Sequence, residues 1–217
     1  MRNIKWKWQD TLIVVLGLAS IGFALFNYNA LPDQLPAQFG VTGEVNRYWS
    51  KNSAIACLGA LGLLFPLLMH FIRSIDPRRE NYAKFENAYA MTRLAMALLF
   101  DFIFVLVIMY GLNINLPVGK IAVGAIGVLF IVIGNYMPQV KDNYFIGIRT
   151  PWTLHNPEVW RKTHRFAGGL WMIGGLLMIG SIFTGGIWNT VVIVIALVLS
   201  TLVPVVYSWM MAQRLKA

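Results

Sequence analysis

The sequence predicts an all-α polytopic membrane protein with six transmembrane helices and both termini in the cytoplasm. Three observations point to this fold class. Of the 217 residues, 58% are hydrophobic and only 12% are charged, whereas soluble domains are about 45–50% apolar and about 25% charged. Six apolar segments each approach the roughly 20 residues that cross a bilayer as a helix. Lysines and arginines gather in alternate connections, which is typical of membrane proteins.

The first predicted span follows a basic N-terminus, which is also typical of a signal peptide. No small-x-small cleavage site precedes the polar stretch at Asn27, so we expect an uncleaved span. The fourth span is the weakest, because it is short, rich in glycine and carries Lys120 near its start. The six predicted spans are Thr11–Tyr28, Ser53–Ile72, Met91–Leu112, Val118–Gly134, Phe166–Phe183 and Trp188–Met211.

The distribution of basic residues predicts the orientation. Fifteen of the 18 lysines and arginines lie at the two ends of the chain and in the second and fourth connections, and the other three are Arg47, Lys51 and Lys120. This asymmetry over short loops places the basic side in the cytoplasm. The net charge of +9 then reflects basic residues that anchor the cytoplasmic side and are attracted to anionic lipid headgroups. We therefore expect the lipid bilayer as a partner and no direct binding of nucleic acid.

We expect the chain to form one membrane bundle with two regions. Residues 1–112 would hold three spans and a loop at residues 30–52, and residues 113–217 would hold three spans and a loop at residues 135–165. Cys57 is the single cysteine, so the sequence predicts neither a disulfide framework nor a cysteine-based metal site.

The 30–52 loop, ALPDQLPAQFGVTGEVNRYWSKN, is expected outside the cell. Its prolines keep the entry extended. Apolar residues flank a Thr-Gly-Glu turn, which predicts a small hairpin with Gly43 at a positive-φ position. Tyr48 and Trp49 fit an aromatic belt at the membrane interface. A plain surface loop and a ligand-binding loop both remain open.

The 135–165 loop is expected in the cytoplasm. Pro138 ends the fourth helix. The segment Asn143–Leu154, NYFIGIRTPWTL, has no clear helical period, so we predict a loop in which Asn143 is a turn residue. A new helix should begin after Asn156, a good N-cap, with Pro157 in its first position.

Four residues of that new helix are predicted to lie on one of its faces. Trp160, Thr163, His164 and Ala167 are spaced by three and four residues and should share one face of the helix. An amphipathic entry helix with basic side chains reaching the headgroups explains residues 156–165, but it does not explain the aromatic and basic residues that precede them.

These two loops carry a family resemblance. GNYMPQVKDNYFIGIRTPWTL and VWRKTHRFAGGLW resemble the signature of the SdpI family, which are bacterial membrane proteins whose namesake gives immunity to a secreted killing peptide. LPDQLPAQFGVTGEVNRYWSK is similar to the DUF1648 domain that often precedes that signature. The resemblance implies a six-span bacterial membrane protein that protects against a peptide toxin, and in the namesake it also implies capture of a cytoplasmic repressor.

Candidate site residues follow from the resemblance and from the loops. A hydrophobic peptide toxin outside the cell would meet the 30–52 loop, and its candidates are Pro36, Phe39, Gly43, Tyr48 and Lys51. A repressor would meet a patch on the 135–165 loop, in which arginine supplies a planar donor fork and tryptophan a large anchor. The patch candidates are Asn143, Tyr144, Gly147, Arg149, Thr150, Pro151, Trp152 and Trp160. For Arg149 and Trp152, contact with lipid headgroups is the competing interpretation.

Asp101 suggests a second class of function. It is the only acidic residue deep inside a predicted span. A charge at the centre of a bilayer costs about 2.5–3.5 kcal/mol on insertion scales, so Asp101 should face the bundle or water. It could relay protons or ions in a small ion-coupled transporter, or be a protonated structural group. Arg93 lies about 12 Å away along the same helix, too far for a direct pair. His70, at a helix end beside Arg73, is expected at the membrane interface.

The sequence favours no enzyme. Three separated histidines, no cysteine pair and no Ser-His-Asp order argue against hydrolysis and metal chemistry. No glycine-rich phosphate loop is present. We therefore expect no catalytic residues, no metal and no cofactor.

Overall fold

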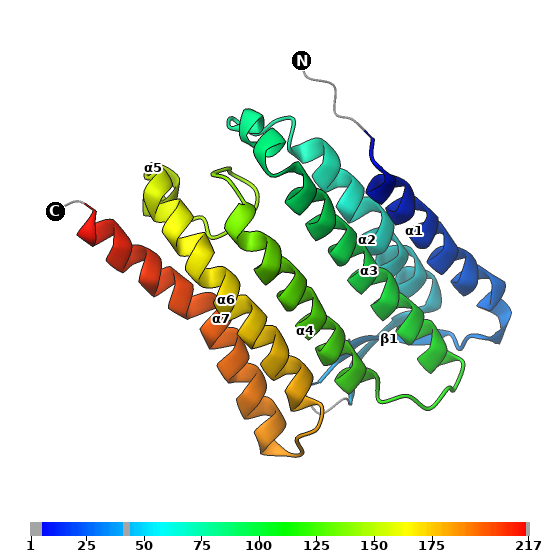
Figure 1. Cartoon of the computed structure of the whole chain (residues 1–217). Helices are drawn as coiled ribbons and strands as arrows, with labels where there is room; N and C mark the ends of the chain where they lie inside the picture. Colours follow the sequence, from blue (N-terminus) through cyan, green and yellow to red (C-terminus); the bar gives the residue numbers. More distant parts are fainter. Residues whose placement is uncertain (1–5, 41–43, 216–217) are drawn as a thin grey trace. The chain divides into compact units, whose positions relative to one another are not determined.

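The computed structural model describes residues 6–40 and 44–215, and almost all of its elements are helices (Figure 1). Gly43, predicted at the hairpin turn, lies outside the described residues. The elements are α1 (Trp8–Phe26), η1 (Tyr28–Ala30), β1 (Gln34–Phe39), β2 (Val45–Ser50), α2 (Lys51–Ile72), η2 (Arg79–Lys84), α3 (Glu86–Gly111), α4 (Val118–Tyr136), η3 (Met137–Gln139), α5 (Pro151–His155), α6 (Pro157–Ser181) and α7 (Ile187–Arg214).

Within the described residues, five helical segments are long and apolar enough to cross a membrane: α1, α2, α3, α4 with η3, and α7. They coincide with five of the six predicted spans, and the protein is a multi-pass membrane protein. The predicted span Phe166–Phe183 lies in α6, whose first turns carry Glu158, Arg161, Lys162 and Arg165. These charges make α6 less apolar than the other five. The six-span count and the sidedness stay predictions.

The chain divides into two compact units, each discontinuous in sequence. The first unit comprises Met1–His70 and Arg93–Ala125, and the second comprises Phe71–Thr92 and Ile126–Ala217. The division predicted between residues 112 and 113 stays a prediction.

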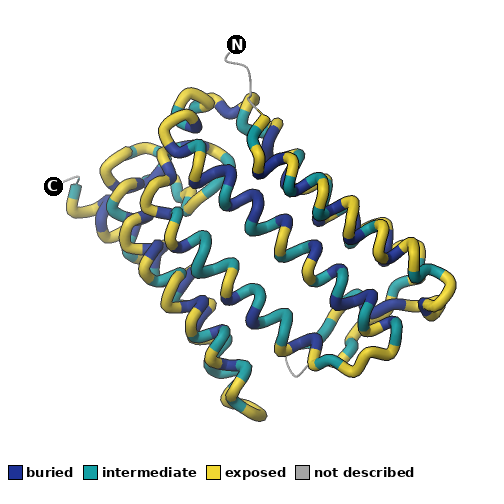
Figure 2. The backbone as a smooth tube through the Cα atoms, turned by 45° about the vertical axis from the view of Figure 1, so that its right-hand side comes forward, coloured by how far each residue is buried: buried dark blue, intermediate teal, exposed yellow. Residues whose placement is uncertain are grey.

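In the first unit, the hairpin packs on the helices through a shared apolar core. Leu31 and Leu35 from the hairpin segment are buried with side chains of α1, α2 and α3. The opposite faces of the helices carry exposed apolar side chains, and buried and exposed residues alternate along the helical tubes in Figure 2. Such faces suit contact with lipid tails rather than water. The buried core members are Ala24, Leu31, Leu35, Ala54, Ile55, Phe104, Val107 and Ile108.

The predicted hairpin is confirmed. Strands β1 and β2 pair antiparallel, with Phe39 opposite Val45 and Gln34 opposite Ser50. The register shifts between Pro36 and Gln38. Proline has no N–H for the ladder, and an irregularity of this kind lets the strand continue past it.

In the second unit, glycines bring α4, α6 and α7 close together. A Cβ added to Gly168 of α6 would lie 2.7 Å from the carbonyl oxygen of Gly134 in α4. A Cβ on Gly174 would lie 2.1 Å from the Ser200 hydroxyl of α7. No side chain fits in either place.

Candidate functional site

The 135–165 loop is built from short, well-capped elements. Helix α4 ends at Tyr136 and η3 follows. The prediction of a loop throughout Asn143–Leu154 is wrong at its C-terminal end, because Pro151–His155 forms helix α5. The Thr150 hydroxyl accepts the N–H of Thr153, and proline in the first position suits a helix start. The predicted start of the next helix is confirmed, since the Asn156 side chain accepts the N–H groups of the first turn of α6.

Asn143 organises the turn at the beginning of this loop, which confirms it as a turn residue. Its side chain is fully buried. The Asn143 Oδ1 accepts the N–H groups of Phe145 and Ile146 at 2.9 and 2.8 Å, and its amide donates to the carbonyls of Lys141 and Ile146. One side chain therefore satisfies four backbone groups, which fixes the turn.

A second segment, between α2 and α3, supports this turn. The buried carboxylate of Asp76 accepts the Tyr144 N–H and the Tyr82 hydroxyl, both at 2.9 Å. Burial and the hydrogen bond to Asp76 raise the pKa of Tyr82. Tyr82 therefore stays a neutral donor, and its hydroxyl also lies 3.3 Å from Asn143 Oδ1.

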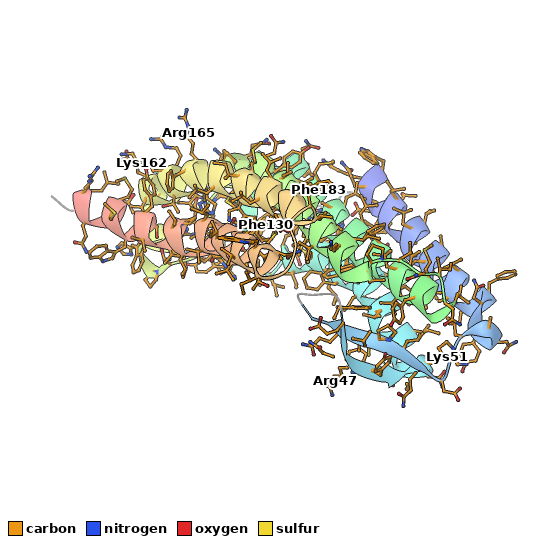
Figure 3. All side chains as sticks on the ribbon, turned by 90° about the horizontal axis from the view of Figure 1, so that it is seen from below. Arg47, Lys51, Phe130, Lys162, Arg165 and Phe183 are labelled. Atoms are coloured by element: carbon orange, nitrogen blue, oxygen red, sulfur yellow. The ribbon has the colours of Figure 1, made fainter. Side chains whose placement is uncertain are left out.

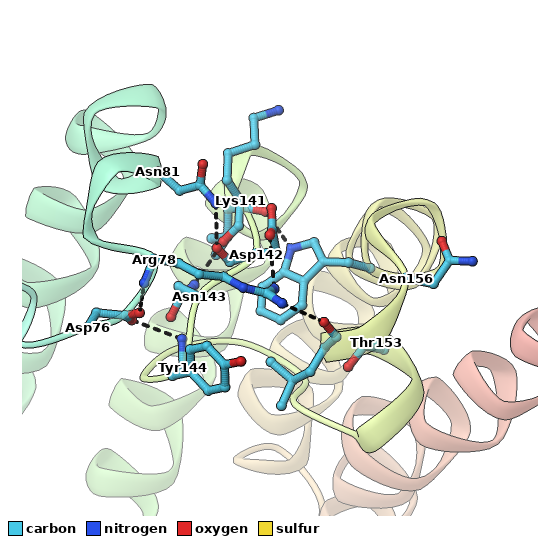
Figure 4. Close-up of polar contacts among 12 residues, drawn as sticks. Asp76, Arg78, Asn81, Lys141, Asp142, Asn143, Tyr144, Thr153 and Asn156 are labelled. Carbon is cyan, nitrogen blue, oxygen red and sulfur yellow. Dashed lines mark hydrogen bonds and ion pairs between the residues drawn. The ribbon is translucent and has the colours of Figure 1, made fainter.

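Arg78 and Asn81 extend the same contact (Figure 4). Arg78 donates to the Asp142 carboxylate at 2.9 Å and to the carbonyl of Leu154 at 2.7 Å. Asn81 donates to the carbonyl of Asp142 at 2.8 Å. The turn and the end of α5 are thus held by one segment, here named the bracing segment (residues 76–82).

His164 fastens the middle of the loop to α6. Its Nδ1 lies 2.9 Å from the carbonyl oxygen of Trp160, which can only accept, so Nδ1 carries the hydrogen. Its Nε2 accepts the Ile148 N–H at 3.0 Å. Burial lowers the pKa of His164 to about 4, against the opposing effect of the Trp160 carbonyl. Gly147, at φ 104°, allows this contact, because a Cβ there would lie 2.4 Å from Nε2.

The predicted face of α6 is confirmed: Trp160, Thr163, His164 and Ala167 are all buried. Trp160 Nε1 donates to the carbonyl of Val140 at 2.8 Å. At the far end of the loop, half-buried Trp152 donates to the Ser208 hydroxyl of α7 at 2.7 Å. The loop is therefore fixed to α6 and to α7.

The predicted patch divides into interior and surface. The buried side chains of Asn143 and Trp160 hold the loop and present nothing to a partner. The outer members are Tyr144, which is 41% exposed, together with Gly147, Arg149 and Pro151. Arg149 donates to the carbonyl of Tyr144. We name Tyr144, Arg149 and Pro151 the outer patch. In α6, Lys162 and Arg165 extend away from the helix (Figure 3).

The candidates of the 30–52 loop also divide. Pro36 is buried, and half-buried Phe39 lies edge-on to Tyr110 with ring centroids 5.8 Å apart. Lys51 donates to the carbonyls of Tyr28 and Leu31 at 3.2 and 3.1 Å, which closes the end of η1. Tyr48, 49% exposed, is the candidate that presents a large surface.

Sequence reasoning missed a buried charge cluster in the first unit. Asp10 of α1 forms an ion pair with Arg93 of α3, and Arg93 also donates to the carbonyl of Pro66 in α2 at 3.2 Å. His70, expected at the interface, is buried with its Nδ1 3.1 Å from Asp10. Asp10 also accepts the Lys7 N–H, and an acid in the first turn of a helix looks in sequence like an ordinary capping residue.

Asp101 faces the interior of the first unit, as predicted. It is 6% exposed. The Ser20 hydroxyl oxygen lies 3.0 Å from Asp101 Oδ1. A Cβ on Gly62 would lie 2.0 Å from the same oxygen, so only glycine leaves room for the carboxyl. In the part of the chain that the structure describes, no group of three or more His, Cys, Asp or Glu residues could hold a metal ion.

The regions that match known families contain the 30–52 loop and most of the 135–165 loop. The SdpI/YfhL protein family matches residues 139–208, and the domain of unknown function DUF1648 matches residues 15–69. The chain is also 26% identical to the "Immunity protein SdpI" of Bacillus subtilis (strain 168) over 198 residues, which cover 89% of this chain and 93% of that protein. Together these matches make the chain similar to the SdpI family along most of its length. The family match begins at η3 and ends at Ser208, the residue that accepts the Trp152 hydrogen bond. No solved structure matches the chain.

Proposed function

We propose that this chain is a member of the SdpI family and an immunity protein of the bacterial cell membrane that protects its host against a secreted hydrophobic peptide toxin. The observation that carries the proposal is the similarity to an immunity protein along 89% of the chain. The name of that relative describes protection rather than catalysis, so we propose no enzymatic activity.

In this proposal the 30–52 loop faces outside and meets the toxin. Tyr48 is the exposed aromatic of the hairpin, and aromatic side chains on rigid elements are frequent anchors for apolar ligands. The other candidates act indirectly: Phe39 packs against the apolar core, Lys51 bonds the carbonyls at the end of η1, and Pro36 is buried.

In the same proposal, binding of the toxin outside is signalled to a cytoplasmic repressor that docks on the outer patch. Its support is the fixed geometry of the 135–165 loop, since a partner that docks there meets side chains whose backbone is already ordered. Preorganisation lowers the entropic cost of binding. The guanidinium of Arg149, which donates to the Tyr144 carbonyl, supplies a planar donor, and the exposed ring of Tyr144 supplies an aromatic surface.

Protection is tested in a toxin-sensitive host that expresses the chain and is challenged with secreted candidate peptides. We expect wild type to restore growth. Tyr48→Ala should weaken protection by about tenfold in toxin concentration, which corresponds to about 1.4 kcal/mol. The matched control is Asn46→Ala, an exposed residue of the same strand as Tyr48. Undiminished killing at full membrane expression contradicts the immunity proposal.

Recruitment of the repressor is tested separately. For any repressor encoded beside the gene of this protein, the fraction of the repressor that is bound to the membrane is measured. Arg149→Ala should reduce that fraction, whereas Lys141→Ala, an exposed cation of the same loop, should leave it unchanged. Equal recruitment by wild type and Arg149→Ala removes the outer patch from the proposal but leaves protection intact.

A second candidate function, a small ion-coupled transporter, is favoured by one observation, the buried carboxyl of Asp101 in α3. Vesicles reconstituted with wild type and Asp101→Asn decide it. Identical ion flux in the two preparations rejects transport.

A further inference from the structure

At the contact between Asp101 and Ser20, hydrogen-bond acceptors outnumber the hydrogens that can be donated to them. The Ser20 hydroxyl oxygen lies 3.0 Å from Asp101 Oδ1 and 3.0 Å from the carbonyl oxygen of Gly17. A serine hydroxyl has one hydrogen and two acceptor lone pairs. If Asp101 is a carboxylate, that hydrogen can serve only one of the two oxygens.

The second carboxyl oxygen of Asp101 increases this shortage of hydrogen-bond donors. Asp101 Oδ2 is buried and has no hydrogen-bond partner among the described residues. As a carboxylate, Asp101 would therefore share a single donor with a backbone carbonyl while most of its charge stays unsolvated. Buried charges are ordinarily paired and hydrogen-bonded.

Among the residues that the structure describes, Asp101 forms no ion pair. The groups that face the carboxyl are Ser20 from α1 and Gly62 from α2. The nearest cation along α3, Arg93, lies eight residues away and is paired with Asp10, next to His70. A metal ion would need several oxygen ligands, whereas the surroundings of the carboxyl described here supply one hydroxyl.

One added hydrogen completes the contact. With a proton on Oδ1, Asp101 donates to the Ser20 oxygen, and the Ser20 hydroxyl donates to the carbonyl of Gly17. Each hydrogen then has an acceptor at 3.0 Å, and Oδ2 becomes a neutral carbonyl oxygen, which is far cheaper to bury than a charge.

We propose that Asp101, Ser20 and Gly17 form a proton-binding site inside the first unit, and that the proton is bound at neutral pH. The proton is the ligand, and it joins α3 to α1. Gly62 keeps α2 clear of the carboxyl. Loss of the proton leaves a lone charge among apolar helices, so proton release and loosening of this helix contact occur together.

The test is infrared difference spectroscopy of the intact protein in lipid nanodiscs. Wild type at pH 7 should show the carbonyl stretch of a protonated carboxyl, which Asp101→Asn should lack. Ser20→Ala should shift that band to higher frequency, because the hydrogen bond to the hydroxyl is lost. Ser53→Ala, an exposed serine of α2, should leave it unmoved.

Stability against pH gives an independent readout. Asn is a neutral substitute for the protonated acid, so Asp101→Asn should unfold at the same temperature as wild type below about pH 4, where the carboxyl is protonated in the folded and the unfolded chain alike. Above that pH the variant should become progressively more stable than wild type, because unfolding of wild type then releases the bound proton. Absence of the carboxyl band from wild type at pH 7 overturns the proposal, as does a band that persists in Asp101→Asn. These results do not depend on whether the protein gives immunity.

Discussion

The imidazole of His164 is useful to the loop only while it is neutral. Its Nε2 must keep a lone pair for the Ile148 N–H, because a proton there would point one donor at another. The neutral ring also stacks on Trp160, with centroids 4.1 Å apart. One side chain thus sets both the position of Gly147–Ile148 and the acid sensitivity of the loop.

We predict that the 135–165 loop loosens in acid. The pKa of His164 falls from 6.5 to about 4 in the folded protein, so the unfolded chain binds more protons between these values. The stabilisation is complete above pH 6.5 and is lost as the pH falls towards 4, with a total of roughly 3 kcal/mol. The protection factor of the Ile148 amide, which compares its exchange rate with that of an unfolded chain at the same pH, should therefore fall over this range.

The control for this prediction is His164→Gln, which offers an acceptor oxygen but does not titrate. Its Ile148 exchange should lack the step between pH 6.5 and 4. A step of equal size in His164→Gln would show that another group is responsible.

Helix α6 offers a matched pair of neighbouring glycines. A Cβ on Gly168 meets the Gly134 carbonyl oxygen at 2.7 Å, whereas a Cβ on Gly169 meets nothing within 4 Å. We expect Gly168→Ala to destabilise the second unit by roughly 1–3 kcal/mol through overpacking, and Gly169→Ala to be neutral or stabilising through helix propensity. Thermal unfolding in detergent compares them, and equal effects would contradict close α4–α6 packing.

The ion pair of Asp10 and Arg93 ties α1 to α3 and is almost fully buried. Arg93→Met leaves the Asp10 carboxylate without its guanidinium, so we expect a loss of about 3–5 kcal/mol. The double variant with Asp10→Asn should recover part of this loss. Removing the exposed pair of Glu158 and Lys162 should cost no more than about 1 kcal/mol. A double variant no more stable than Arg93→Met would reject the pairing argument.

These elements show which parts of the fold could be predicted from sequence. The start of α6 was predictable because Asn156 and Pro157 act on adjacent backbone groups. The hairpin was predictable because its turn and both strands are contiguous. Asp10 with Arg93, and Asp76 with Tyr144, are separated by 83 and 68 residues, and each residue alone resembles a common surface or capping residue. Helix α5 was missed because it is five residues long, too short for a visible period.

The number of spans determines where the C-terminus lies. With five crossings the two ends of the chain would be on opposite sides of the membrane, and with six they share one side. We predict six, because the charge asymmetry places both ends on the basic side. A fluorescent protein fused after Ala217 should then fold and fluoresce in the cytoplasm, and a periplasmic-type reporter there should be inactive. The reverse pattern would mean that α6 does not cross.

The order of synthesis gives the bracing segment a further meaning. Asp76 leaves the ribosome 68 residues before Tyr144, the residue whose N–H it accepts. Arg78 is synthesised 76 residues before Leu154, whose carbonyl it binds. Domains usually assemble in the order in which they are made, but here an early segment stays open until α4 and α5 arrive. In a nascent chain that stops before residue 140, Asp76 can be bonded only from within the bracing segment, and Arg78 lacks both the Asp142 carboxylate and the Leu154 carbonyl.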